Sequence, residues 1–314
     1  MKRYVPFILA VLLLFTLVAA GCSDKDAVTD EQVVAENTAI KQTVVYYQDE
    51  QGFMVPVMRK IPWEEGIAKA TLKKMVSTPE NIAEMEKSGL SFLLPSTVTF
   101  DLDIKDGLAR VDIRGGIGAT NKAEESNVIS AVVNTLCNFP TVEKVQVLID
   151  GRKLDKMKYG TDISKPLTGF DLNQEALPEG VKAKEENKLT LYFLSKTGGF
   201  LVPVTRYTAQ KANAETAIRE LLKGPADTAT LDNVFPAGTR LQELSAGKDA
   251  LSLNFSKEFS DLKSSPDLEK RALKAIMLTV NQYDNTESVI IKVEGKEYEP
   301  AGGQETVTTF ANEY

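Results

Sequence analysis

The chain has 314 residues but no histidine and only two cysteines. Without histidine it cannot form a Ser-His-Asp or Cys-His catalytic triad. Zinc sites of the histidine-containing kinds are excluded as well, and two cysteines cannot build a structural cysteine cage around zinc. These shortages remove the residues on which many hydrolases and metalloproteins depend.

The two cysteines also give no sign of a disulfide framework. Cys137 lies inside the apolar run 128–137, which is typical of a buried thiol that packs as an apolar residue. As a nucleophile, Cys137 would need a base that the sequence does not supply. The folded body must therefore be held together by its hydrophobic cores.

Positive charge is in deficit, because the formal net charge is -7. An acidic body is a poor match to a phosphate backbone, which argues against nucleic acid as a partner, and we expect weak repulsion from acidic lipids and wall polymers. An apolar fraction of 43% with 26% charged residues indicates a globular protein rather than a disordered one.

The main uninterrupted apolar stretch, residues 6–18, lies near the start of the chain, behind the basic head Met1-Lys2-Arg3. Small residues, Ala19-Ala20-Gly21, then precede Cys22. This order indicates an export signal over residues 1–21. The run is short for a membrane span, but an uncleaved membrane anchor and plain secretion with cleavage elsewhere remain open.

The small residues before Cys22 resemble a bacterial lipobox. The resemblance implies that Cys22 receives a lipid, palmitate included, and becomes the mature N-terminus. Two or more acyl chains anchor a protein stably. We therefore expect a body anchored to the cell membrane by lipid, on its extracytoplasmic face.

The rest of the chain is an internal repeat. Gly52 and the run 53–59 (FMVPVMR) reappear as Gly199 and the run 200–206 (FLVPVTR), and the strand-like run 142–151 reappears at 286–295. Such long copies suit tandem domains rather than solenoid units.

Each copy predicts the order β-β-α-β-β-α-β. Pro56 and Pro203 fall in the second strand of each first hairpin and predict an edge. Thr78-Pro79 is expected to end the first helix, and Asp106-Gly107 to turn the second hairpin. The last strand is expected to pair in parallel with an earlier one.

The fold class predicted from this order is α+β, with two tandem α/β-sandwich domains, each a mixed β-sheet with two helices on one face. The predicted boundaries are a signal peptide at 1–21, a polar tether at 22–42, domain 1 at 43–155, an interdomain linker at 156–187, domain 2 at 188–300, and a C-terminal tail at 301–314. We expect the polar tail to fray.

The lipobox, the two Gly-Phe-x-Val-Pro-Val hairpins and the final strand of each copy together resemble the GerMN (sporulation and spore germination) family, over residues 43–300. The resemblance implies a lipoprotein of endospore-forming bacteria that acts in spore formation and germination, in the space between the mother-cell and forespore membranes. It also implies a ring-building-motif-like fold, with components of a sporulation channel or engulfment complex as protein partners. It provides no catalytic residue.

Two glycine-containing patterns invite other interpretations. Asp101, Asp103 and Asp106-Gly107 loosely suggest a calcium loop, but Lys105 occupies the fifth position, so a hairpin is the favoured interpretation. Residues 115–118 (GGIG) lack the G-x-G-x-x-G spacing of a phosphate cradle and favour a plain loop.

Glu64-Glu65 and Glu124-Glu125 could supply the two carboxylates of a wall-glycan hydrolase. Both pairs are expected at helix starts, where acids favour the helix dipole in any case. The residues shared by the two copies are glycine, proline, apolar or aromatic, and enzyme sites seldom consist of these residue types alone. Ligand binding would need an aromatic-lined pocket between the domains, which the single Trp63 and the scattered tyrosines do not indicate.

The sequence therefore predicts a non-catalytic assembly or scaffolding lipoprotein, with Cys22 as the lipidation site and no catalytic residue, metal or cofactor. The alternatives left open are a lipoprotein that binds cell-wall glycan, with peptidoglycan contact, and a carboxylate-dependent wall hydrolase.

The hydrolase alternative has a direct test. If the protein cleaves wall glycan through these carboxylates, Glu64→Gln or Glu124→Gln must abolish digestion of purified walls, because an amide cannot transfer the proton. We expect no digestion by the unaltered protein. Measurable digestion that either substitution removes would reverse the assignment.

Overall fold

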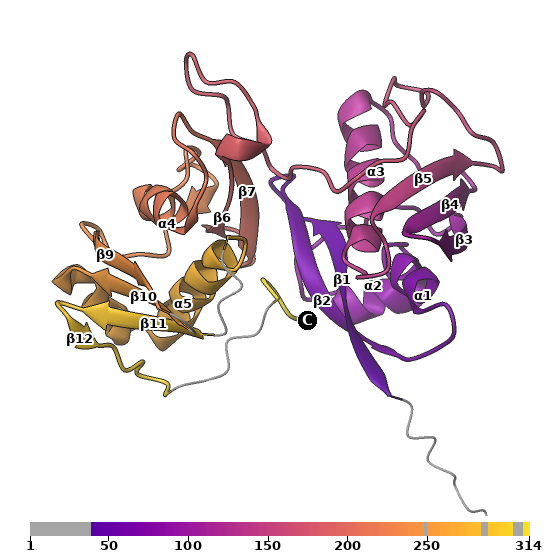
Figure 1. Ribbon diagram of the computed structural model, residues 1–314. Coiled ribbons are helices and arrows are strands. Elements are labelled where there is room, and N and C mark those ends of the chain that lie inside the picture. Colours follow the sequence, from indigo (N-terminus) through magenta and orange to yellow (C-terminus); the bar gives the residue numbers. More distant parts are fainter. Residues whose placement is uncertain (1–38, 248–249, 284–287, 304–309) are drawn as a thin grey trace, which may run out of the picture. The chain divides into compact units, whose positions relative to one another are not determined.

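The computed structural model describes residues 39–247, 250–283, 288–303 and 310–314 (Figure 1). The first copy begins with an antiparallel hairpin and continues with helices and three further strands. Its elements are β1 Ile40–Gln48, β2 Met54–Pro62, α1 Ile67–Lys73, α2 Pro79–Met85, β3 Thr99–Lys105, β4 Leu108–Arg114, α3 Lys122–Cys137 and β5 Lys144–Ile149.

The second copy repeats this order with small additions and without a counterpart of α2. Its elements are the 3-10 helix η1 Glu185–Asn187, β6 Lys188–Ser195, β7 Leu201–Tyr207, α4 Ala214–Lys223, β8 Leu231–Asp232, β9 Leu241–Ala246, β10 Ala250–Phe255, the 3-10 helix η2 Lys257–Ser264, α5 Pro266–Val280, β11 Ser288–Val293 and β12 Lys296–Glu297.

The predicted α+β fold is confirmed, and its sheets are mixed. In each copy the last long strand pairs in parallel across a helical connection, β5 with β4 and β11 with β10, as the sequence predicts. The strands of a copy do not form one sheet, however. The β1–β2 hairpin is a sheet of its own beside β3-β4-β5, and β7-β6-β8 is separate from β12-β11-β10-β9.

The helix expected before Thr78-Pro79 is shorter than predicted. It ends at Lys73, so Met75 and Val76 are buried beyond it. Thr78 does not end this helix but begins the next one, α2, where its side chain accepts a hydrogen bond from the Asn81 backbone. The misassignment has a physical reason, because threonine followed by proline is also the typical start of a helix.

The hairpin predicted at Asp106-Gly107 is confirmed. Both residues have positive φ, 50° and 76°, which is the conformation that a two-residue turn of type I′ requires.

The core is built from the inward faces of both copies. Tyr47 and Met75 are among the largest fully buried side chains of the first copy, and Phe193, Phe255 and Phe259 among those of the second. The buried apolar residues of the two copies belong to one cluster, and residues 38–314 form one compact unit. Within the described residues no helix is both long and apolar enough to cross a bilayer.

A buried glutamate stands in the first turn of the long helix of each copy. Glu125 of α3 is 1% exposed and accepts hydrogen bonds from the backbone nitrogens of Tyr159 (2.8 Å) and Thr161 (2.9 Å). Glu269 of α5 is 2% exposed and accepts from the hydroxyl of Tyr298 and the nitrogen of Ala301 (2.9 Å). Each glutamate thus fastens the segment that follows the last strands of its own copy.

These bonds explain how an acid is kept in the interior. Burial pushes the pKa of Glu125 upward, but the hydrogen bonds from Tyr159 and Thr161 outweigh it, so the pKa lies below its ordinary value. The copies therefore share a buried acid besides the glycine, proline, apolar and aromatic residues that the sequence comparison of the copies shows. The helix start favours the charged form as well.

We expect Glu125→Gln to lower the free energy of unfolding by about 1–3 kcal/mol, because the amide leaves one of two backbone donors without an acceptor. Urea unfolding followed by circular dichroism measures this. Since the pKa is lowered in the folded state, the stabilisation is present at neutral pH and is lost as the pH falls through the folded pKa.

The neighbouring exposed carboxylate provides the control. Glu124→Gln should leave the free energy of unfolding nearly unchanged, because Glu124 lies on the surface, where water can replace an acceptor that Thr120 or Asn121 loses. Equal effects of the two substitutions would contradict the role given to Glu125.

Candidate functional site

Each hairpin has an edge strand that carries a proline. Among the named strands β2 pairs with β1 alone, and β7 lies at the end of the order β7-β6-β8, so the edges predicted from Pro56 and Pro203 are confirmed. The backbone nitrogens of Met54, Met58 and Leu201 point outward from these edges, toward acceptors on Asn173 and Asn312, and Met58 forms an isolated β-bridge with Glu313. By alternation Pro56 and Pro203 also face outward, where neither has a hydrogen to donate.

Asn173 bridges the two edges at one end. Its side-chain oxygen accepts from the nitrogen of Met54 (2.8 Å), and its side-chain nitrogen donates to the carbonyls of Met54 (2.9 Å) and Pro203 (2.7 Å). The side-chain amide thus supplies donors and an acceptor where a continuous strand ladder is interrupted.

Asn312 bridges the same edges at the other end. Its side-chain nitrogen donates to the carbonyls of Pro56 and Leu201, both at 2.9 Å, and its side-chain oxygen accepts from the nitrogen of Leu201 (2.8 Å). Its own carbonyl accepts from Met58 (2.8 Å). Asn312 is 8% exposed, so the expectation that the tail frays is wrong for residues 310–314.

A third bridge joins the hairpin turns. The hydroxyl of Ser195 donates to one carboxylate oxygen of Asp49 (2.9 Å), while the other oxygen accepts from the nitrogens of Gln51 and Phe53. Asp49 is 5% exposed. The two copies are therefore joined through side chains placed at equivalent points of the two hairpins.

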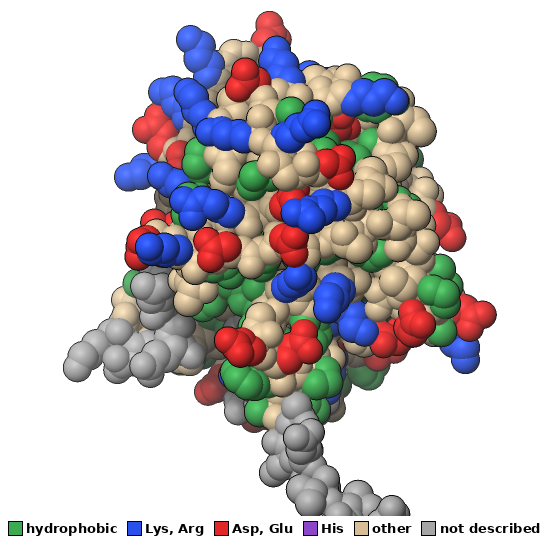
Figure 2. Space-filling view, turned by 90° about the vertical axis from the view of Figure 1, so that its right-hand side faces the viewer, with side chains coloured by type: hydrophobic (Ala, Val, Ile, Leu, Met, Phe, Trp, Pro, Cys, Tyr) green, Lys and Arg blue, Asp and Glu red, His purple; other side chains and the backbone are tan. Residues whose placement is uncertain are grey.

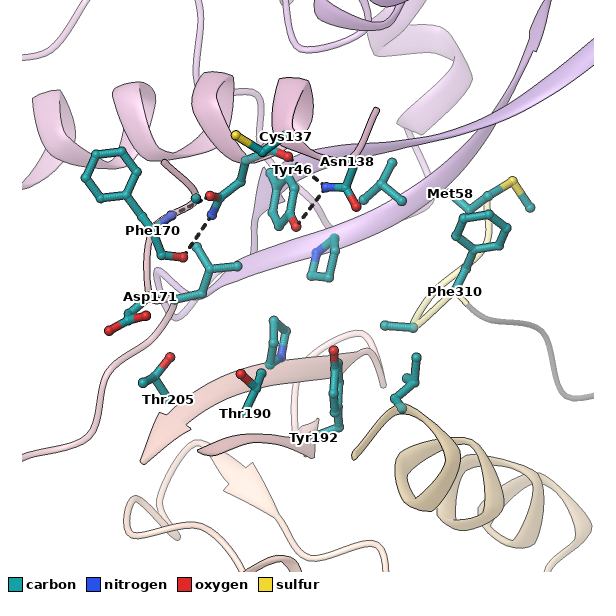
Figure 3. A pocket seen from close by; sticks show the side chains of 18 of the residues that line it. Tyr46, Met58, Cys137, Asn138, Phe170, Asp171, Thr190, Tyr192, Thr205 and Phe310 are labelled. Carbon is teal, nitrogen blue, oxygen red and sulfur yellow. Dashed lines mark hydrogen bonds between the residues drawn. The ribbon is translucent and has the colours of Figure 1, made fainter. Parts of the chain in front are cut away.

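A cavity of about 540 Å³ opens beside these bridges, between β1–β2 and β6–β7 (Figure 3). Its walls are related by the repeat. The first hairpin contributes Val44, Tyr46, Pro56 and Met58, and the second contributes Thr190, Tyr192, Pro203 and Thr205 at the equivalent positions. The volume falls in the range of small-molecule sites.

The tyrosines give the cavity its chemical character. Figure 3 shows Tyr46 and Tyr192 projecting into the space from opposite walls. Asn138 at the end of α3 donates to the hydroxyl of Tyr46 (3.3 Å). Burial raises the pKa of both tyrosines, so both hydroxyls stay protonated at neutral pH. They can donate hydrogen bonds to a guest, and their rings can stack on an apolar or sugar face.

The charged residues of the cavity already have partners. Lys188 pairs with Asp171 (3.2 Å) and Glu185 (2.7 Å), and these contacts raise the pKa of Lys188 although burial opposes them. Cys137 also lines the cavity, and burial raises the pKa of its thiol. A protonated thiol is a poor nucleophile.

The structure also places the residues singled out in the sequence. Cys22 lies outside the described residues. Glu64 and Glu65 are exposed and precede α1, whose first turn holds no acid, so the prediction that this pair lies at the helix start is wrong. Glu124 accepts a hydrogen bond from the backbone nitrogen of Thr120, just before α3, and the buried Glu125 accepts one from the backbone nitrogen of Tyr159.

Two acids of the suspected calcium loop, Asp101 and Asp103, are ion-paired. Asp101 contacts Lys69 (3.3 Å) and Arg114 (3.1 Å), and Asp103 contacts Arg110 (3.5 Å). Figure 2 shows basic and acidic side chains interspersed on one face of the molecule. In the part of the chain that the structure describes, no cluster of three or more acids or cysteines is arranged to hold a metal ion.

The glycine run 115–118 has a structural purpose. At Gly115, with φ 96°, an added Cβ would lie 2.2 Å from the carbonyl oxygen of Thr97. Only glycine permits this close approach of two backbones. Residues 115–118 form a loop, as the sequence predicts.

Sequence reasoning missed the two bridging asparagines. Asn173 lies in the segment predicted as a linker, and Asn312 lies in the predicted tail. Neither belongs to a periodic pattern, and an isolated asparagine in a loop indicates a turn more often than a bridge. The positive φ of Asn173, 49°, agrees with that general tendency but does not reveal its partners.

Comparison with known proteins gives consistent matches. Residues 44–155 and 190–299 match the model of the Germane family, described as sporulation and spore germination. The spore germination protein GerM of Bacillus subtilis (strain 168) is 29% identical over 273 residues, which are 83% of this chain and 73% of that protein.

Solved structures agree with these sequence matches. The tandem GerMN domains of the sporulation protein GerM from Bacillus subtilis superpose with a TM-score of 0.72 at 28% identity, covering 88% of this chain and 99% of that chain. The first GerMN domain of the same protein matches 41% of this chain and 97% of that chain at 30% identity, with a TM-score of 0.38.

We expect Asn312→Ala to lower the free energy of unfolding by about 2–4 kcal/mol, because it leaves the amide of Leu201 and two carbonyls without partners. Hydrogen exchange should accelerate more at the amide of Leu201, which also loses its local acceptor, than at Leu253 of β10, which reports only the loss of global stability. Asn281→Ala, at an exposed asparagine after α5, is the control. Unchanged exchange at Leu201 would refute the bridge.

Proposed function

The chain belongs to the Germane family of sporulation and spore germination proteins, and we propose that it is a non-catalytic, lipid-anchored protein required for spore formation and germination. The observation that carries the proposal is the match of both copies, in tandem, to the structure of the sporulation protein GerM over 99% of that chain. A role in sporulation and germination is what this relationship supports.

The chemistry of the described residues supports a role without catalysis. Of the four glutamates that resemble hydrolase carboxylates, Glu125 is fully engaged by backbone donors. The thiol of Cys137 has a raised pKa, and the chain has no histidine to activate it. The features that the copies share, the hairpin prolines and the buried glutamates, organise the backbone.

We place the anchor at Cys22, and the folded body on the extracytoplasmic face of the membrane, between mother cell and forespore. The lipobox-like sequence supports the anchor. The proposed partners are protein components of a sporulation channel or engulfment complex. The bridges through Asn173, Asn312 and Ser195 support a body whose two domains act together as a scaffold.

One observation favours a second function, the binding of a small ligand or a fragment of wall glycan. The sequence does not indicate an aromatic pocket between the domains, yet the structure has one, with Tyr46, Tyr192, Phe170 and Phe310 among its lining residues. Aromatic faces with a few hydrogen-bonding groups are typical of ligand sites.

Deleting the gene in its own bacterium tests the first proposal. We expect fewer heat-resistant spores and slower germination, both restored by the unaltered gene and by Glu64→Gln and Glu124→Gln. Cys22→Ala should fail to restore either, although the protein is still made, because the substitution removes the thiol that carries the lipid anchor. Normal sporulation and germination after deletion would overturn the proposal.

Proximity crosslinking in sporulating cells separates the two functions. Recovery of membrane-complex proteins that disappears with Cys22→Ala supports the scaffold. Recovery of glycan fragments or a small molecule that disappears with Tyr192→Leu supports the cavity instead and argues against a purely scaffolding protein.

A further inference from the structure

Three adjacent apolar residues are exposed at the open end of the β1–β2 hairpin. Ile40 is 63% exposed and Trp63 is 50% exposed, and Pro62, opposite Ile40 in the ladder, is exposed as well. The nitrogen of Trp63 donates to the carbonyl of Ala39 (2.7 Å), which keeps the three residues together. We call Ile40, Pro62 and Trp63 the hairpin foot.

The foot stands where the described chain begins. The segment from Cys22 to Ala39 spans at most about 60 Å when fully extended. The foot is therefore the described part of the body nearest, along the chain, to the lipid proposed at Cys22. Tethering turns a second contact into an intramolecular event with a high effective concentration, so a small apolar surface that is weak alone becomes sufficient.

We propose that the hairpin foot lies in the interface of the bilayer that holds the lipid on Cys22. The inference rests on the lipid anchor of the proposed function and goes beyond it, since it assigns the contact that orients the body on the membrane. Tryptophan is enriched at membrane interfaces because its ring is apolar and its N–H is polar. The exposed apolar residues elsewhere, Ile82 and Leu177 among them, have no such connection to the anchor.

The charges around the foot define the membrane surface it suits. Lys41 and Lys60 are exposed beside it, and so are Glu64 and Glu65. Two charges of each sign cancel, so attraction to anionic lipid does not drive the contact. The foot should therefore enter a zwitterionic bilayer, with its charged neighbours in the headgroup layer, and anionic lipid should not strengthen the contact.

Trp63 is the only tryptophan of the chain, so its fluorescence reports on the foot alone. The mature chain, residues 22–314, with Cys137→Ser leaves Cys22 as the single thiol. Coupling that thiol to a maleimide lipid in phosphatidylcholine vesicles installs the anchor chemically. We expect emission at shorter wavelength than for uncoupled protein, and quenching by lipids that carry a nitroxide near the headgroup.

Matched variants locate the contact. Ile40→Ser should reduce the quenching about two-fold, because it removes one of the two largest apolar side chains of the foot. Leu177→Ser, at a residue that is 44% exposed, should leave it unchanged. Both positions are on the surface, and circular dichroism verifies that each variant is folded.

The outcomes are distinct. Emission and quenching equal to those of the uncoupled protein would overturn the inference, as would quenching that appears only with anionic lipid. Because the anchor is coupled chemically, these results do not depend on lipidation in cells. Conversely, a Cys22→Ala protein that sporulates normally would overturn the proposed anchor while leaving the vesicle measurement intact.

Discussion

The structure depends on two strand edges that cannot pair directly. Pro56 and Pro203 occupy equivalent outward positions on β2 and β7, and neither can donate a hydrogen bond. Buried backbone groups need partners, so the side-chain amides of Asn173 and Asn312 supply them. Asn173 comes from the segment between the copies and Asn312 from near the end of the chain, so four distant parts of the sequence, these two segments with β2 and β7, meet at the two strand edges.

The cavity lies beside these strand edges. The hairpins are joined through asparagine side chains rather than through a shared strand ladder. The faces that carry Tyr46 and Tyr192 lie on opposite sides of the cavity, and both tyrosines project into it. The repeat makes the two walls similar, and the interruption of strand pairing leaves room between them. The arrangement that joins the two hairpins thus also leaves an aromatic-lined cavity between them.

A second repeated device holds each copy together internally. Glu125 and Glu269 occupy the first turn of α3 and α5 and fasten the chain that follows the last strands. An unpaired buried carboxylate would be costly, and each of these accepts two hydrogen bonds, Glu125 from two backbone nitrogens and Glu269 from a hydroxyl and a backbone nitrogen. The acids thereby serve the fold, which is compatible with the scaffold role proposed above.

The sequence by itself determined what depends on local pattern. Period-two alternation predicted the hairpin strands, Asp106-Gly107 the turn and the prolines the strand edges, since each follows from the conformations of a few neighbouring residues. The order of the elements, with a helix before the last strand, predicted the parallel pairing of that strand. Local rules failed at Thr78-Pro79, because the same pair of residues can begin a helix or follow one.

Tertiary structure decided everything that joins residues far apart in the chain. Asn312 contacts Pro56 across 256 positions, and no local pattern encodes such a partner. The same holds for the cavity, whose walls look like ordinary strand residues until the two hairpins face each other. Glu125 likewise resembles any acid at a helix start, because its burial depends on the later residues Tyr159 and Thr161.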